Sequence, residues 1–362
     1  MKSIAPKWLA TGLAGVIILA ASGCEMPPPE SVQRGYRGTG MVHVANPKTV
    51  AAVAAANVAP EAAPAVPADG PKAKDIYKNV QVLGDLSVGE FTRLMVAMTN
   101  WVAPEQGCNY CHADGNFEAD NVYTKTVARR MLQMTRTINA DYKSHVGDTG
   151  VTCYTCHRGK PVPQKIWFTA DGKDKSAFAG WRYGQNAPAH SVARASLPND
   201  PFTPYFTQAG IIGVASDKAL PVKGQTGASI QHTEWTYGLM MHFSDSLGVN
   251  CTYCHNTRAF SSWAESSTPR VTAWHGIRMV RTLNNTYLDP LKPVYPAERL
   301  GPTGDAPKAN CATCHQGANK PLLGAAMLKD HPELAAHPAP APEPAAAPAA
   351  SVKTAAKAPA KS

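Results

Sequence analysis

The chain has 362 residues, of which 44% are hydrophobic and 17% charged, and this is enough for one or two domains with buried cores. Its formal net charge of +9 raises the question of an acidic partner. No Lys/Arg-rich run with interleaved aromatic residues occurs, so we exclude nucleic acid as that partner.

The first residues have the features of an export signal. Two lysines precede an apolar run over residues 8–21, which is too short for a comfortable membrane span. The run leads into Ala-Ser-Gly-Cys at residues 21–24, which resembles a bacterial lipobox with Ala in place of the usual Leu. We therefore predict a signal peptide over residues 1–23 that is removed, and a lipoprotein whose acylated Cys24 anchors it to a membrane. The alternatives are an ordinary signal peptide with an unrelated cysteine, or an uncleaved helix that acts as the anchor.

Changes in composition predict how the remaining chain is divided. Residues 24–70 contain the lipid anchor and an Ala/Pro-rich linker, and residues 332–362 form a disordered Ala/Pro/Lys tail that cannot bury enough apolar surface to fold. Between them we predict two halves, residues 71–190 and 231–331, joined by a connector over residues 191–230.

Local signals in both halves favour helices. Ser87 and Glu90 form a capping box at the start of one helix, in which each side chain satisfies a free backbone amide of the other. Thr268 is the predicted N-cap of a second helix that runs to about residue 287. Gly248 is expected to end a third.

Four copies of Cys-x-x-Cys-His carry the chemistry, and they use eight of the nine cysteines. In such a motif two cysteine sulfurs bond the vinyl groups of a c-type haem, and the histidine ligates its iron. We number them motif 1 (residues 108–112), motif 2 (153–157), motif 3 (251–255) and motif 4 (311–315). The predicted haem-binding cysteines are Cys108, Cys111, Cys153, Cys156, Cys251, Cys254, Cys311 and Cys314, and the histidines are His112, His157, His255 and His315.

Four covalently bound haems predict electron transfer outside the cytoplasm, because haem is attached to this motif after export. Their propionates add about eight negative charges, which nearly cancel the positive excess of the protein. A zinc or thiol-redox role for the cysteine pairs is remote, since a histidine follows each pair directly.

The two halves look like duplicates. Residues 128–139 lie between motifs 1 and 2, and they align with residues 273–284 between motifs 3 and 4. The alignment pairs Met134 with Met279, Arg136 with Arg281, and Asn139 with Asn284. We therefore predict a mainly α fold with extensive irregular loops, a multihaem cytochrome c built from two pseudo-repeated halves with two helix–turn–motif units each.

The second axial ligand of each iron decides what the haem does. Methionine raises the reduction potential, a second histidine lowers it, and an open position allows catalysis on a small molecule. Candidates in the preceding helices are Met95 or Met98, Met131 or Met134, and Met240 or Met241. Because Met134 has an equivalent in Met279, we assign that pair to packing, and Met131 is the better ligand candidate.

The fourth iron has no local methionine, because Gly276 occupies the position that aligns with Met131. His145 and His275 both remain candidates for its second ligand. Three other histidines, His43, His331 and His337, lie in the predicted linker or tail, and we expect them to be solvated.

This pattern resembles the tetrahaem cytochrome subunit of purple-bacterial photosynthetic reaction centres over most of residues 72–332. The resemblance rests on the order and identity of five strings, at residues 77–84, 127–132, 150–159, 200–203 and 311–317. It implies the axial pairs Met95–His112, Met131–His157, Met240–His255 and His145–His315. It also matches Arg270 to a family arginine near the third haem.

The resemblance implies an electron-transfer subunit of photosynthesis, not an enzyme, on the periplasmic face of the photosynthetic membrane. Its partners would be the bacteriochlorophyll-bearing reaction-centre core and a soluble donor, either a small cytochrome c or a high-potential iron–sulfur protein. The haem of motif 3 would lie nearest the bacteriochlorophyll pair, and that of motif 1 would receive the electron. The competing readings are a multihaem periplasmic reductase and a donor to another membrane complex.

Overall fold

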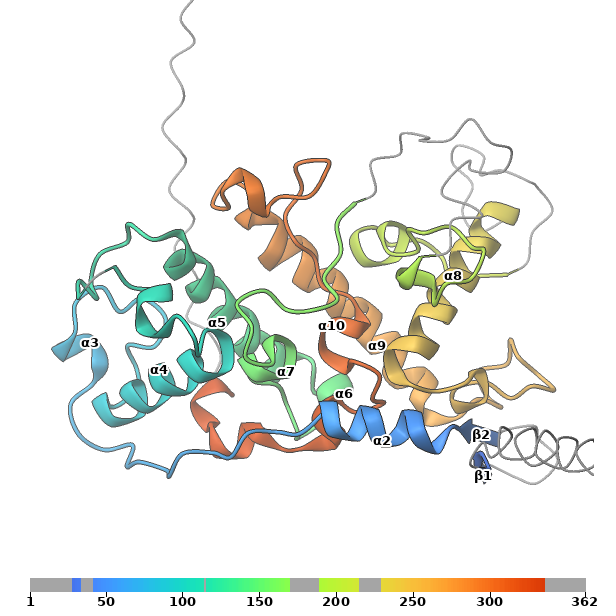
Figure 1. Cartoon of the computed structure of the whole chain (residues 1–362), viewed down its shortest axis with the longest axis horizontal. Helices are drawn as coiled ribbons and strands as arrows, with labels where there is room; N and C mark the ends of the chain where they lie inside the picture. Colours follow the sequence, from blue (N-terminus) through green and yellow to red (C-terminus); the bar gives the residue numbers. More distant parts are fainter. Residues whose placement is uncertain (1–27, 34–41, 114, 170–188, 215–228, 336–362) are drawn as a thin grey trace, which may run out of the picture.

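A computed structural model describes residues 28–33, 42–113, 115–169, 189–214 and 229–335 of the chain. The described part is mainly helical with long irregular segments, as predicted (Figure 1). The predicted signal peptide, Cys24, His337 and most of the predicted tail lie outside it.

Short helices connected by irregular chain make up most of the fold. The two strands are β1 (Glu30–Gln33) and β2 (Val42–Ala45), which pair antiparallel with Glu30 opposite Ala45. The α-helices are α2 (Pro47–Ala56), α3 (Ala73–Ile76), α4 (Val88–Val102), α5 (Tyr123–Asp141), α6 (Lys143–Val146), α7 (Cys153–His157), α8 (Ile230–Leu247), α9 (Thr268–Thr282) and α10 (Cys311–His315). The 3-10 and π turns are η1 (Gly107–Tyr110), η3 (His190–Val192), η4 (Thr203–Thr207), η5 (Cys251–Tyr253), η6 (Leu283–Leu288), η7 (Asp289–Leu291), η8 (Ala297–Arg299), η9 (Pro321–Gly324), η10 (Met327–Asp330) and η11 (Pro332–Leu334).

Local sequence signals set several helix ends. Helix α4 begins at the predicted capping box, where Ser87 N donates to Glu90 Oε2 at 2.9 Å and Glu90 N donates to Ser87 Oγ at 3.2 Å. Helix α8 ends at Gly248, which adopts the left-handed conformation with φ of 62°. Helix α9 starts at Thr268, but its N-cap is Ser267, one residue earlier than predicted.

The elements that bear the four motifs form a row along the molecule. Motif 1 lies in η1 after α4, motif 2 in α7, motif 4 in α10, and motif 3 at η5 after α8. Helix α4 packs against α7, α7 against α10, and α10 against α8. The order of the motifs in space is therefore 1, 2, 4, 3, with α4 at one end of the row and α8 at the other (Figure 1).

Two buried apolar clusters support the ends of this row. One gathers Leu83, Leu94, Trp101, Leu132 and Leu334, and the other gathers Phe202, Tyr205, Phe206, Leu239 and Ile277. Met279 is buried in the second cluster, and Met134 packs against it. These contacts agree with the packing role that the repeat predicts for this pair.

The Ala/Pro-rich linker predicted within residues 24–70 includes a helix, α2, whose C-terminal end contacts the folded chain. Asn46 caps α2, and Asn57 at the other end of that helix is only 1% exposed. Further along, the Arg93 guanidinium donates to the carbonyls of Ala63 at 2.7 Å and Pro64 at 2.8 Å. Alanine has the highest helix propensity, so an Ala-rich segment can form a helix on the surface of a folded domain as well as a linker. Composition alone does not distinguish the two.

The folded chain also continues past the predicted start of the tail at residue 332. Leu334 is fully buried, and His331 is 1% exposed, so the prediction of a solvated His331 is wrong. Its Nδ1 lies 3.0 Å from Glu333 Oε1, and its ring packs edge-on against Trp101 at 4.6 Å. Arg93 pairs with the Glu333 carboxylate at 3.6 Å, so α4 supplies the positive charge that this buried carboxylate needs as a partner.

Candidate haem-binding sites

A connected cavity of about 3070 Å³ runs along the row of motifs. Pockets for drug-sized ligands measure roughly 300–1,000 Å³, so this space is large enough for several such groups. All eight motif cysteines and all four motif histidines line it. So do the other predicted ligands Met95, Met131, Met240 and His145, together with the alternatives Met98, Met134 and Met241.

Backbone carbonyls orient three of the four motif histidines. In three of them Nδ1 donates to a carbonyl oxygen at 2.9 Å: His157 to Lys160, His255 to Phe260, and His315 to Ala318. His112 packs against Phe117, five residues further on, as His255 packs against Phe260. A donated Nδ1 proton leaves Nε2 with a free lone pair, which is the arrangement of a metal-binding imidazole.

Burial shifts the pKa values of the motif side chains toward their uncharged forms. Burial lowers the pKa of all four motif histidines, and it lowers that of His315 to about 4, so the imidazoles are neutral ligands at physiological pH. Burial raises the pKa of Cys153 and Cys311 to about 12 and that of Cys111 and Cys254 to about 11.

His145 comes to motif 4 from the other half of the chain. Its Nδ1 donates to Thr272 O at 2.9 Å, and its ring centre lies 6.1 Å from that of His315. Two metal–imidazole bonds of about 2 Å each, with the ring radii added, account for a separation of this size. Burial lowers the pKa of His145 as well, which keeps its Nε2 free for a metal.

Gly276 makes room for His145. A Cβ atom built on Gly276 would lie 2.5 Å from Cε1 and 2.8 Å from Nδ1 of His145, closer than real contacts allow. The imidazole thus occupies the space that a side chain at position 276 would fill. The rival His275 packs against Trp274 and is not among the residues that line the cavity, so the geometry favours His145.

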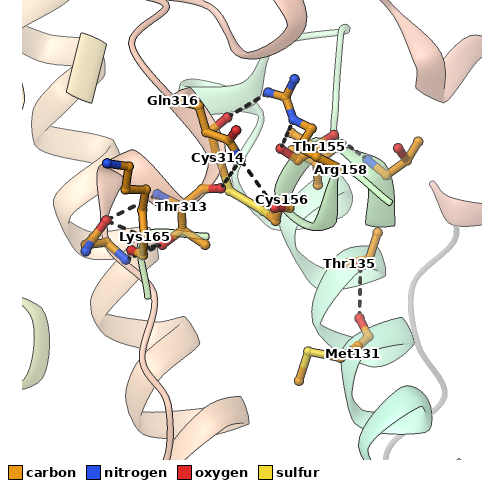
Figure 2. The surroundings of a disulfide bond; sticks show 12 residues. Met131, Thr135, Thr155, Cys156, Arg158, Lys165, Thr313, Cys314 and Gln316 are labelled. Carbon is orange, nitrogen blue, oxygen red and sulfur yellow. Dashed lines mark hydrogen bonds between the residues drawn. A yellow bond between two sulfur atoms is a disulfide. The ribbon is translucent and has the colours of Figure 1, made fainter. Parts of the chain in front are cut away.

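Motifs 2 and 4 meet at their second cysteines. The structure joins the sulfurs of Cys156 and Cys314 in a disulfide, with the two Cα atoms 4.5 Å apart (Figure 2). This differs from the sequence prediction, because a sulfur in a disulfide cannot also form a thioether to haem. The physical reason is proximity: α7 packs against α10, and this contact places the two sulfurs side by side.

The residues present fit covalently attached haem. Each motif offers paired cysteines and a neutral histidine to the same cavity, and His145 stands opposite His315 across a gap of suitable width. Together with the mainly helical fold, this donor set defines a c-type cytochrome.

Comparison with known proteins identifies the family. The family model for "Photosynthetic reaction centre cytochrome C subunit" matches residues 25–335. The photosynthetic reaction center cytochrome c subunit of Rubrivivax gelatinosus is 54% identical over 92% of this chain and 90% of its own length. That of Thermochromatium tepidum is 53% identical over 89% and 80%, and that of Roseobacter denitrificans is 45% identical over 91% and 93%. The chain belongs to the family of photosynthetic reaction centre cytochrome c subunits.

Family membership confirms the predicted resemblance and an electron-transfer role with covalent c-type haem. Association with a membrane complex follows from membership as well. Within the described residues, no helix has the length and apolarity to cross a bilayer.

Proposed function

We propose that this chain is a periplasmic four-haem relay, which carries electrons from a soluble cytochrome c or high-potential iron–sulfur protein to the photo-oxidised bacteriochlorophyll pair of a reaction-centre core. Bound haem supplies the one-electron iron couples, and close spacing permits tunnelling between them. The observation that carries the proposal is the order of the four motifs, 1, 2, 4, 3, along one connected cavity.

We assign the protein ligands as follows. In the haem-loaded protein all eight motif cysteines form thioethers, so for Cys156 and Cys314 the thioether and the disulfide are alternative states of the same sulfurs. The axial pairs are Met95–His112, Met131–His157, Met240–His255 and His145–His315. Support comes from the common cavity, from the Nδ1–carbonyl bonds that leave Nε2 free, and from the fit of His145 over Gly276.

The two halves are proposed to be structural repeats, and equivalent residues make equivalent contacts. In the first half Arg136 Nε donates to Glu333 O and Asn139 Nδ2 to Leu334 O; in the second Arg281 Nε donates to Tyr205 O and Asn284 Nδ2 to Phe206 O. The same asparagines also bond the chain just before motifs 2 and 4, since Val151 N and Ala309 N donate to their Oδ1 atoms at 2.7 and 2.8 Å. Equivalent asparagine hydrogen bonds therefore support the second motif of each half.

The N-terminal hairpin supports an orientation with motif 3 toward the membrane. The Val42 carbonyl accepts from Asn250 Nδ2 at 3.0 Å and from Thr252 Oγ1 of motif 3. The neighbouring His43, which we had expected to be solvated, is half-buried and packs edge-on against Tyr253.

Strand β1 of this hairpin begins at Glu30, only six residues after Cys24. Six extended residues span roughly 20 Å, so an acyl anchor at Cys24 would keep motif 3 close to the bilayer. Motif 1, after α4 at the opposite end of the row, is then the entry point for the soluble donor (Figure 1).

Carbon monoxide tests the relay against a periplasmic reductase. A reductase needs one exchangeable iron position, whereas the proposed axial pairs close all four irons on both faces. The dithionite-reduced complex should show no carbon monoxide difference spectrum. Stoichiometric binding to native material would support the reductase and contradict the relay.

Met131→His is expected to lower the midpoint potential of one haem, because imidazole stabilises ferric iron relative to the thioether. A redox titration of the haem absorption bands in the purified complex measures it. Met134→Leu is the matched control three residues along the same helix, and it should leave all four potentials nearly unchanged. The reverse pattern would transfer the ligand assignment to Met134.

Cys24→Ser is expected to release the exported cytochrome from membranes in cells that lack the reaction-centre core subunits, since two or more acyl chains provide stable anchoring. Fractionation followed by haem staining measures the soluble share. Unchanged membrane retention of this variant would contradict an acyl anchor at Cys24.

A further inference from the structure

The segment 42–67 runs from motif 3, past the junction of motifs 2 and 4, to helix α4, and we call it the strap. It begins on motif 3 through Val42 and passes the junction of motifs 2 and 4 at Asn57. The Tyr154 hydroxyl of motif 2 donates to Val58 O at 3.5 Å. The strap then reaches α4, the helix before motif 1, where Arg93 donates to the carbonyls of residues 63 and 64.

Among the described polar residues of the strap, Asn57 alone is as little as 1% exposed. Both the nitrogen and the oxygen of its side-chain amide form hydrogen bonds. Its Nδ2 donates to Val53 O at 2.9 Å, which closes α2, and to Gln316 O at 3.5 Å. Its Oδ1 accepts from Arg158 Nη2 at 3.1 Å. One side chain therefore holds the residues that directly follow motif 2 and motif 4.

Arg158 and Gln316 also reach across to each other's motif (Figure 2). Arg158 Nη2 donates to Cys314 O at 3.2 Å, and Gln316 Nε2 donates to Cys156 O at 3.4 Å. Both residues adopt the left-handed conformation, with φ of 51° and 49°. This reciprocal pair fixes how α7 and α10 sit against each other, and Asn57 is bonded to both members.

We propose that Asn57 is a positioning residue that sets the relative placement of the haems of motifs 2 and 4 for electron transfer between them. The inference rests on the proposed relay. Each haem would be tied to its motif by two thioethers and an iron–histidine bond, so a displacement of α7 against α10 would move the two haems apart. Electron tunnelling falls steeply with distance, and the central step of the row would slow.

Two variants separate positioning from general stabilisation. Asn57→Ala removes the bonds to Arg158 and Gln316 without a change in charge. Asn57→Asp keeps the shape and the Arg158 contact and loses the two bonds that Nδ2 donates, and it adds a negative charge beside motifs 2 and 4, which favours ferric iron. Asn46→Ala is the matched control, because it removes the cap of α2, a 2.9 Å bond to Lys48 N, and contacts no motif.

The experiment uses the full membrane complex with flash-induced haem spectroscopy, a redox titration, and amide hydrogen exchange over residues 153–159 and 311–317. Asn57→Ala should slow transfer from the motif 1 end to the motif 3 end and speed exchange in both peptides, while oxidation of the first haem after the flash keeps its wild-type rate. Asn57→Asp should shift the potentials of two haems negatively and leave the other two unchanged.

If the two Asn57 variants match Asn46→Ala in transfer rate, potentials and amide exchange while the wild-type complex relays electrons, the role of Asn57 is contradicted and the proposed relay is not. A wild-type complex whose haems stay reduced after the flash would instead overturn the proposed function. A uniform loss of stability without a selective effect on the central step would assign Asn57 a structural role only and contradict the proposal.

Discussion

His145→Ala is expected to leave one of the four haem irons five-coordinate, high-spin and able to bind carbon monoxide after reduction. The imidazole faces His315 at 6.1 Å between ring centres and is held by Thr272 O, and the described residues offer no methionine at the position equivalent to Met131. The carbon monoxide difference spectrum of the purified complex should show one new binding site per chain.

His275→Ala is the matched control for this prediction. Its ring packs against Trp274 and lies outside the cavity lining, so its removal should leave the spectrum low-spin. A high-spin centre in His275→Ala, with none in His145→Ala, would show that the local histidine completes the fourth iron.

Gly276→Ala is expected to have nearly the same spectroscopic effect without any change in a ligand. The new Cβ would meet the His145 ring at 2.5 Å, and that ring is anchored at Nδ1, so it must leave its present position opposite His315. Overpacking of this kind costs about 1–3 kcal/mol, which a folded domain of this size tolerates. The loss of the low-spin signal from one haem, measured by electron paramagnetic resonance, checks the expectation.

Gly89→Ala is the control for a glycine-to-alanine change in a helix. A Cβ atom at Gly89 would meet Val66 at 3.7 Å, an ordinary contact, so all four haems should keep their native signals. If Gly276→Ala also left all four signals native, His145 would not be the ligand that the glycine admits.

The candidate site could be predicted because its signals are local. Each motif contains its two cysteines and its histidine within five residues. The alignment of the two halves shows that Gly276 occupies the position equivalent to Met131. What fills the space over Gly276 could not be settled from the sequence. His145 lies 131 residues away from it, and the neighbouring His275 was an equally good candidate by spacing alone.

The sequence predicted two helix ends correctly. The predictions were wrong where the conformation of a segment depends on contacts with residues far away in the sequence. Ser87 with Glu90 and the left-handed Gly248 are local devices, and both helix ends were confirmed. The strap was missed because its order depends on partners such as Gln316, 259 residues from Asn57. The burial of His331 was missed for the same reason, since Arg93 and Trp101 belong to α4. A polar residue directly after each of motifs 2 and 4 was the available signal for the Arg158–Gln316 pair.

The order of the motifs in space also explains why Cys156 lies close to Cys314. The two sulfurs lie at the centre of the row, where the units of motifs 2 and 4 pack against each other. This junction is where Asn57, Arg158 and Gln316 converge. A relay with its halves joined here depends on this contact for continuity from one end to the other.

The most direct test of the relay is time-resolved haem absorption after a single flash on the purified complex, with the motif 3 haem marked by the altered band and potential of Met240→His. We predict that the marked haem is the first to oxidise, followed by transfer of the oxidising equivalent toward motif 1. First oxidation of an unmarked haem, or re-reduction of the bacteriochlorophyll pair while all four haems stay reduced, would contradict the account.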